Sequence, residues 1–124
     1  MDSDTKLYLE RAQNELKLTE IIMQLSINKD LQANIPEVGK ADTYFSSVIS
    51  HAYYSIFYTA KAYLLTKGIT TKPPEEHRKT YDEFRELVSQ GIVEEELLRL
   101  YEEVLIKAEE LLGIFRTEKC SEHF

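Results

Sequence analysis

The chain has 124 residues, of which 43% are hydrophobic and 30% charged, a size and balance typical of one globular domain with one core. No apolar run approaches the roughly 18 residues of a membrane span, and no charged-then-apolar leader opens the chain. The single cysteine, Cys120, excludes an intramolecular disulfide and a cysteine metal pair, so a reducing, cytoplasmic location is expected.

The formal charge of -7 is distributed unevenly along the chain. Residues 1–70 carry 7 Lys+Arg against 8 Asp+Glu, whereas residues 71–124 carry 8 against 14. An acidic surface repels a phosphate backbone, so no DNA binding and no bulk attraction of RNA are predicted. A small local basic site remains compatible with this charge.

Helical spacing of apolar residues predicts a first helix over residues 5–25, with Ser3 or Asp4 as its N-cap. Its expected inward-facing residues are Leu9, Ala12, Leu16, Ile22 and Met23. Turn-forming residues then interrupt the periodicity, so a long loop is predicted over residues 26–40.

A long second helix is predicted from Asp42, its expected N-cap, to Lys67, with Gly68 as the C′ residue. This segment is apolar around most of its circumference, which is typical of a helix at the centre of a core or buried by a partner. This helix is therefore predicted either to lie at the centre of the core or to be covered by a partner.

Two shorter helices are expected to follow. Pro73 and Pro74 suit the start of a third helix over residues 74–89, whose expected inward residues are Tyr81, Phe84 and Val88. A fourth helix is predicted over residues 93–119, with an inward stripe of Leu97, Tyr101, Val104, Ala108, Leu111 and Phe115. Residues 1–124 are thus predicted to form one all-α domain, an antiparallel up-down-up-down four-helix bundle.

One face of the long helix combines aromatic, histidine and lysine side chains at steps of four and three: Ser47, His51, Tyr54, Tyr58, Lys61 and Leu65. Tyrosine and histidine offer both apolar area and hydrogen bonding, which favours a surface for a nucleotide, a partner or a second copy. The alternative is that these rings pack against the fourth helix and expose only their polar tips.

His77 lies in the first turn expected for the third helix, where a histidine usually caps or packs. The three histidines show no HxxxH or HxxE spacing, so no metal site is predicted. No glycine-rich phosphate loop and no GxSxG motif is present, and no cofactor is expected.

The C-terminal tail offers one candidate catalytic pair. Six residues separate Arg116 from His123. A guanidinium can hold a phosphate, and an imidazole can act as general base or acid near neutral pH. Together they could assist attack of an RNA 2′-hydroxyl on the adjacent phosphodiester, although an arginine and a histidine at such a distance also arise by chance.

Three segments resemble the HEPN family, the "higher eukaryotes and prokaryotes nucleotide-binding" helical domains. Tyr8-Leu-Glu-Arg-Ala12 followed by Glu15-Leu16 is similar to the family's opening helix. Residues 50–68, SHAYYSIFYTAKAYLLTKG, resemble its histidine- and tyrosine-rich central helix, and residues 76–84, EHRKTYDEF, resemble the start of the helix that follows.

This resemblance implies a four- or five-helix bundle that pairs as a homodimer, often beside a minimal nucleotidyltransferase as one half of a toxin–antitoxin pair. Active members are metal-independent ribonucleases that use an arginine and a histidine with four to six residues between them at the dimer cleft. Arg116 and His123 match that motif in residue type and gap, but Thr117 stands where active toxins usually have asparagine, and the chain ends at Phe124.

Three functions follow as alternatives. The first is a homodimeric binding module that docks a nucleotidyltransferase, a nucleotide, or both, for which His51, Tyr54, Tyr58 and Lys61 are the candidate residues. The second is an RNA endonuclease using Arg116 and His123. The third is a self-associating helical protein without a ligand.

Overall fold

The computed structural model describes residues 2–39 and 42–115, and every regular element in these ranges is a helix. The five helices are α1 (Ser3–Ile27), α2 (Lys29–Ala33), α3 (Phe45–Thr66), α4 (Glu76–Ser89) and α5 (Glu95–Leu112). The all-α prediction is confirmed. No helix in the described ranges is both long and apolar enough to cross a membrane.

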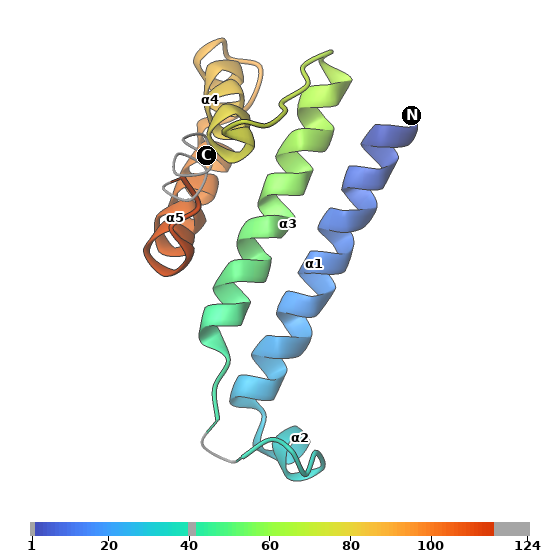
Figure 1. Cartoon of the computed structure of the whole chain (residues 1–124), viewed down its shortest axis with the longest axis vertical. Coiled ribbons are helices and arrows are strands. Elements are labelled where there is room, and N and C mark those ends of the chain that lie inside the picture. Colours follow the sequence, from blue (N-terminus) through green and yellow to red (C-terminus); the bar gives the residue numbers. More distant parts are fainter. Residues whose placement is uncertain (1, 40–41, 116–124) are drawn as a thin grey trace.

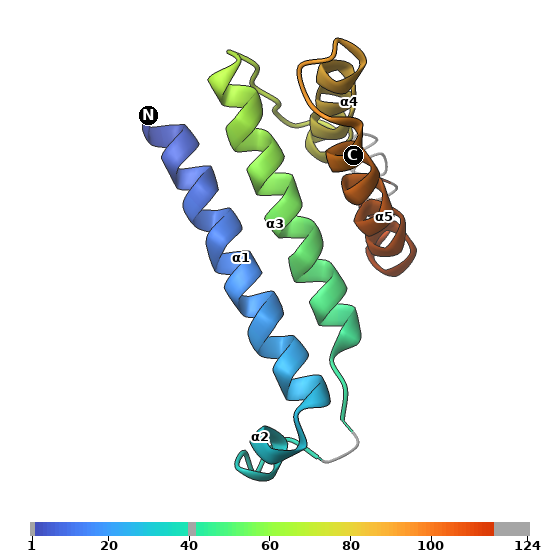
Figure 2. The same cartoon turned by 180° about the vertical axis from the view of Figure 1, so that it is seen from behind.

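Helix α3 lies at the centre of the molecule, as predicted, with α1 along one side and α4 and α5 on the other (Figure 1). Helices α1 and α3 are antiparallel, because the start of α1 lies beside the end of α3, and Figure 2 shows the same arrangement from behind. The short helix α2 lies in the connection between them.

The up-down-up-down bundle is not confirmed by this arrangement. Within the described residues α1 contacts α2 and α3 but neither α4 nor α5, so the four longer helices do not close around one core. Helix α4 is also seen nearly end-on in Figure 1, where α1 and α3 lie lengthwise. The chain therefore forms an α1–α3 hairpin and an α3–α4–α5 core that share α3.

Small side chains form the contact between α1 and α3. Thr5, Ala12 and Ser26 are the buried residues of α1, and they lie seven or fourteen positions apart on one face. The Ser55 hydroxyl donates to the Ala12 carbonyl oxygen at 3.0 Å, which requires close approach of the two helices. Leu16, predicted to face the core, is instead 50% exposed, because the α3-facing stripe is defined by small residues.

The connection after α1 is more structured than a loop. Asn28 caps α2 by accepting a hydrogen bond from the Leu31 backbone N–H at 3.0 Å. The buried Gln32 side chain donates to the Leu25 carbonyl oxygen at 2.6 Å, which fixes α2 against the end of α1. Asparagine and aspartate residues spaced through this segment, Asn28, Asp30 and Asn34, hide this short helix from a search for apolar periodicity.

The helix starts also differ from the predictions. Asp2, rather than Ser3 or Asp4, caps α1 by accepting from the Asp4 backbone N–H at 3.2 Å. Asp42 does not cap α3, because its carboxylate accepts from the Gly39 backbone N–H at 2.8 Å and α3 begins at Phe45.

Two glycines end helices through positive φ angles. Gly68 (φ 76°) follows α3, and the Ile69 N–H donates to the Leu64 carbonyl oxygen at 2.9 Å, as expected of a glycine C′ residue. The predicted end of the last helix is wrong: α5 stops at Leu112 because Gly113 adopts φ 58°. Ile114 and Phe115 are helical again after this break, and Ile114 is buried.

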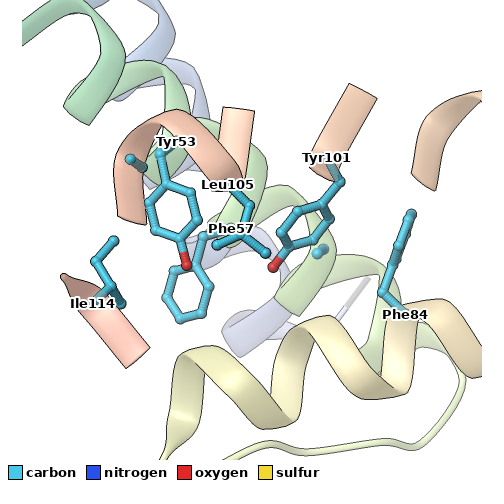
Figure 3. Packing of buried hydrophobic residues seen from close by; sticks show 8 residues of the cluster. Tyr53, Phe57, Phe84, Tyr101, Leu105 and Ile114 are labelled. Carbon is cyan, nitrogen blue, oxygen red and sulfur yellow. The ribbon is translucent and has the colours of Figure 1, made fainter. Parts of the chain in front are cut away.

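The core lies between α3, α4 and α5. Figure 3 shows Tyr53 and Phe57 of α3 beside Leu105 of α5, with Tyr101 of α5 and Phe84 of α4 at the other end of the cluster. Tyr53 and Tyr101 are among the largest fully buried side chains. Aromatic rings thus supply much of this core, whereas the buried residues that α1 contributes to the α1–α3 contact are small.

Candidate functional site

The predicted binding stripe of α3 faces side chains of α1 and α4. Its tyrosines and lysine form one group with residues from both neighbours, which we call the aromatic–basic cluster: Tyr8, Arg11, Tyr54, Tyr58, Lys61 and His77. Helix α3 contributes three members at steps of four and three, α1 two and α4 one. The prediction that Tyr54, Tyr58 and Lys61 share one face is consistent with this geometry.

Lys61 is the most enclosed member of the cluster, with 4% of its surface exposed. Its ammonium group donates to the Thr71 carbonyl oxygen at 3.0 Å and pairs with the Glu76 carboxylate. The same nitrogen lies 4.8 Å from the centre of the Tyr8 ring. These contacts tie α3 to α1 and to the start of α4, so Lys61 is already engaged within the chain.

A cavity of about 320 Å³ adjoins Lys61 at the end of α3. Its lining includes acidic Asp4 and Glu76 and basic Lys61 and Lys72, so its formal charges balance. Since Lys61 is paired with Glu76, this cavity presents little net positive charge to an anion.

Arg11 is the exposed cation of the cluster. Its guanidinium carbon lies 5.8 Å from the centre of the Tyr8 ring and 5.7 Å from that of Tyr58, and the two rings are stacked at 6.1 Å. A planar guanidinium over aromatic rings keeps its donors available at its edges. Tyr8 and Arg11 were not predicted as site residues, although their i, i+3 spacing on α1 could have placed them together.

His77 packs inside the cluster, consistent with its predicted packing role. Its ring stacks on Phe57 with 3.9 Å between centroids, and its Nδ1 lies 2.7 Å from the Tyr53 hydroxyl oxygen. Burial lowers the pKa of His77 to about 4, more than the neighbouring Glu76 carboxylate raises it, and Lys61 lowers it further. His77 is therefore neutral at pH 7.

His51 stands apart from the cluster. Its Nδ1 lies 2.6 Å from a Glu15 carboxylate oxygen, and both side chains are about three-quarters buried. This contact joins α3 to α1 one turn below the tyrosines. The structure thus places His51 in a helix-to-helix contact rather than beside Lys61.

The predicted catalytic pair, Arg116 and His123, lies outside the described residues. Within the described part of the chain, no three His, Cys, Asp or Glu side chains come together where they could hold a metal ion.

Large aliphatic side chains on α1 form a second feature that sequence analysis missed. Leu7, Leu18 and Ile21 are 43%, 39% and 56% exposed. Their spacing places them on one side of α1, opposite the small residues that contact α3. We call Leu7, Leu18 and Ile21 the α1 outer stripe. An amphipathic helix normally turns such residues inward, so this stripe is unusual for a helix that packs against only one long neighbour.

Comparison of the chain with models of protein families, with curated proteins and with solved structures finds no match. The resemblance to the HEPN family therefore stays a prediction from the sequence segments in α1, α3 and α4 described above.

Proposed function

We propose that the chain is a HEPN-type helical binding module that acts as a cytoplasmic homodimer and docks a minimal nucleotidyltransferase, a nucleotide, or both. The observation that carries this proposal is the α1 outer stripe. Its three residues expose large aliphatic surface on a helix that contacts only α2 and α3 in the described structure.

Burial of the stripe would stabilise a dimer substantially. Full burial of one leucine or isoleucine side chain contributes about 1.5–3 kcal/mol. A two-fold contact buries the same residue in both copies, so its contribution counts once for each copy. These side chains are already partly covered, so the gain per residue is below that range. Three residues on each of two copies still supply enough apolar area to form the centre of an interface.

Charge does not oppose self-association through this side of the molecule. Residues 1–70, which include α1 and α3, carry 7 basic against 8 acidic side chains, so two copies meet there with little repulsion. In this proposal the α1–α3 hairpins of two copies pack through α1. The antiparallel four-helix arrangement expected of one chain is then completed between two chains.

The nucleotide part of the proposal is supported by Arg11. Its exposed guanidinium is held over Tyr8 and Tyr58, and such a group can meet a phosphate with two parallel hydrogen bonds. The engaged Lys61 holds Tyr8 in place rather than serving as the phosphate ligand.

Light scattering coupled to size exclusion tests the homodimer. The wild-type chain is expected at twice its 14.5 kDa mass, and Leu18→Glu with Ile21→Glu at its monomer mass. Gln13→Glu, a change at an exposed position of the same helix that is not three or four residues from any member of the stripe, is the matched control and should stay dimeric. A monomeric wild type, or a double variant that remains dimeric while folded by circular dichroism, would refute self-association through α1.

A further inference from the structure

A second apolar surface lies on the other side of α3 from the aromatic–basic cluster. It is a groove of about 540 Å³ between α3 and the start of α5, which we call the α3–α5 groove. Its floor consists mainly of small and apolar α3 residues, and its α5 wall of leucines and aromatic carbon. The lining comprises Ser55, Ile56, Thr59, Ala60, Tyr63, Phe84, Ile92, Val93, Glu94, Leu97, Leu100 and Tyr101.

Two leucines in the wall of the groove are half exposed. Leu97 and Leu100 each leave 50% of their surface open to solvent. Val104 and Leu111 continue the same line along α5 at steps of four and seven, and Leu111 is 47% exposed. Steps of three, four and seven define the seam of a helix that packs lengthwise against another helix.

The length of this seam matches a helix rather than a small molecule. Leu111 lies fourteen positions after Leu97, which corresponds to about 21 Å along the helix axis. The described lining contains no lysine, arginine or histidine, so the groove offers no cation to an anionic nucleotide. Its polar side chains are few: those of Ser55, Thr59 and Glu94, together with the tyrosines Tyr63 and Tyr101.

The surroundings of the groove are acidic. Residues 76–112, which cover α4 and α5, carry 5 Lys+Arg against 11 Asp+Glu, and Glu94 itself lines the groove. A second copy of this chain would present the same acidic surface and meet repulsion. A helix with basic flanks would instead gain attraction and a faster encounter.

We propose that the α3–α5 groove docks an amphipathic helix of a partner protein that has aliphatic anchor residues and lysine or arginine flanks. The groove is separate from the α1 outer stripe, so it is open to a partner helix whether the chain is a monomer or a dimer. The proposal therefore goes beyond self-association and identifies the chemistry of the protein partner.

The probe is a fluorescent synthetic helical peptide of about 18 residues with leucines at i, i+3 and i+7 and flanking lysines. We expect a Kd on the order of 10 µM at low salt by fluorescence anisotropy, and affinity that falls as salt rises. Leu97→Ala with Leu100→Ala should weaken binding at least about tenfold, as loss of central anchors does. A peptide with the same leucines and glutamate flanks should not bind.

Two further variants make the test decisive. Thr59→Tyr fills the groove from an exposed position of its floor and should also abolish binding. Leu18→Ala on α1 is the matched control and should leave the Kd unchanged. Equal binding of the lysine and glutamate peptides, or unchanged binding by the folded Thr59→Tyr variant, would overturn the proposal. Loss of dimer mass in Leu97→Ala with Leu100→Ala would also overturn it, by assigning the groove to a second copy.

Discussion

The His77 ring of α4 stacks directly on the Phe57 ring of α3, with 3.9 Å between their centroids. The Tyr53 hydroxyl oxygen lies 2.7 Å from His77 Nδ1, so one residue of α4 contacts two successive turns of α3. This contact fixes the start of α4 beside the aromatic–basic cluster and links the α1–α3 hairpin to the rest of the core.

The low pKa of His77 predicts a loss of stability in acid. Burial lowers this pKa from 6.5 to about 4, so the unfolded chain takes up the proton first as pH falls between these values. The contribution of the neutral, buried His77 ring to the free energy of unfolding is fully present above pH 6.5 and is lost progressively as the pH falls toward 4. We expect a loss of roughly 1–2 kcal/mol, below the full linkage value because the ring is partly exposed to solvent.

Urea unfolding at pH 7 and pH 4.5 measures this loss. His77→Phe keeps a flat ring against Phe57 but cannot take up a proton, so its stability should fall less between the two pH values. The same pH dependence in both proteins would show that His77 does not titrate as its burial predicts.

The buried pair of Lys61 and Glu76 predicts a cooperative effect. Glu76→Gln removes the negative charge opposite the enclosed Lys61 ammonium and leaves it only neutral acceptors, such as the Thr71 carbonyl oxygen, and we expect a loss of about 2–3 kcal/mol. Lys61→Met in the same chain should recover part of this loss, because it removes the uncompensated charge. Chemical denaturation of Glu76→Gln, of Lys61→Met and of the double variant gives the coupling free energy between the two side chains. Losses that simply add would show that Lys61 and Glu76 do not stabilise the fold as a pair.

The close approach of α1 to α3 predicts that a larger side chain at Ala12 is not tolerated. Ala12 is 4% exposed, and its carbonyl oxygen accepts from Ser55, so Ala12→Leu must push the helices apart. Overpacking of this kind costs about 1–3 kcal/mol. Gln13→Leu, at the neighbouring exposed position, should change the unfolding free energy little, and equal effects at both positions would contradict the packing of this contact.

A binding module predicts no RNA cleavage. Purified wild type, Arg116→Ala and His123→Ala are each incubated with RNA and a chelator, and all three should leave the RNA intact. The acidic overall charge disfavours RNA approach, which is the physical reason for this expectation. Cleavage by the wild type that both substitutions abolish would establish the endonuclease alternative instead.

The sequence predicted the position of α3 and its end well. Apolar residues around most of its circumference indicated a central helix, and Gly68 marked its end because a positive φ suits glycine. The end of α5 was missed for the same physical reason. Gly113 lies within an otherwise continuous apolar pattern, and only the structure shows that it takes a left-handed conformation there.

Apolar periodicity found only part of the face of α1 that contacts α3. Ala12 is buried as predicted, and Leu9, Ile22 and Met23 are half-buried, but Leu16 is exposed. That face is marked by Thr5, Ala12 and Ser26, which are small rather than hydrophobic, while Leu16 and Ile21 point to solvent. Periodicity shows where apolar residues repeat, but not whether the same chain covers them. The cluster at Lys61 was partly predicted from α3 alone, and its members from α1 and α4 required the tertiary structure.

The proposed homodimer forms through contacts between the α1 helices of two copies, and intermolecular NOEs detect such contacts. A dimer is prepared from one copy with labelled leucine and isoleucine methyl groups and one unlabelled copy. We expect intermolecular NOEs to the methyl groups of Leu7, Leu18 and Ile21, and none to those of Leu97 and Leu100. Intermolecular NOEs confined to the leucines of α5 would show that two copies do not associate through α1. A sample that runs at the monomer mass and shows no intermolecular NOEs would show that the chain does not form a homodimer.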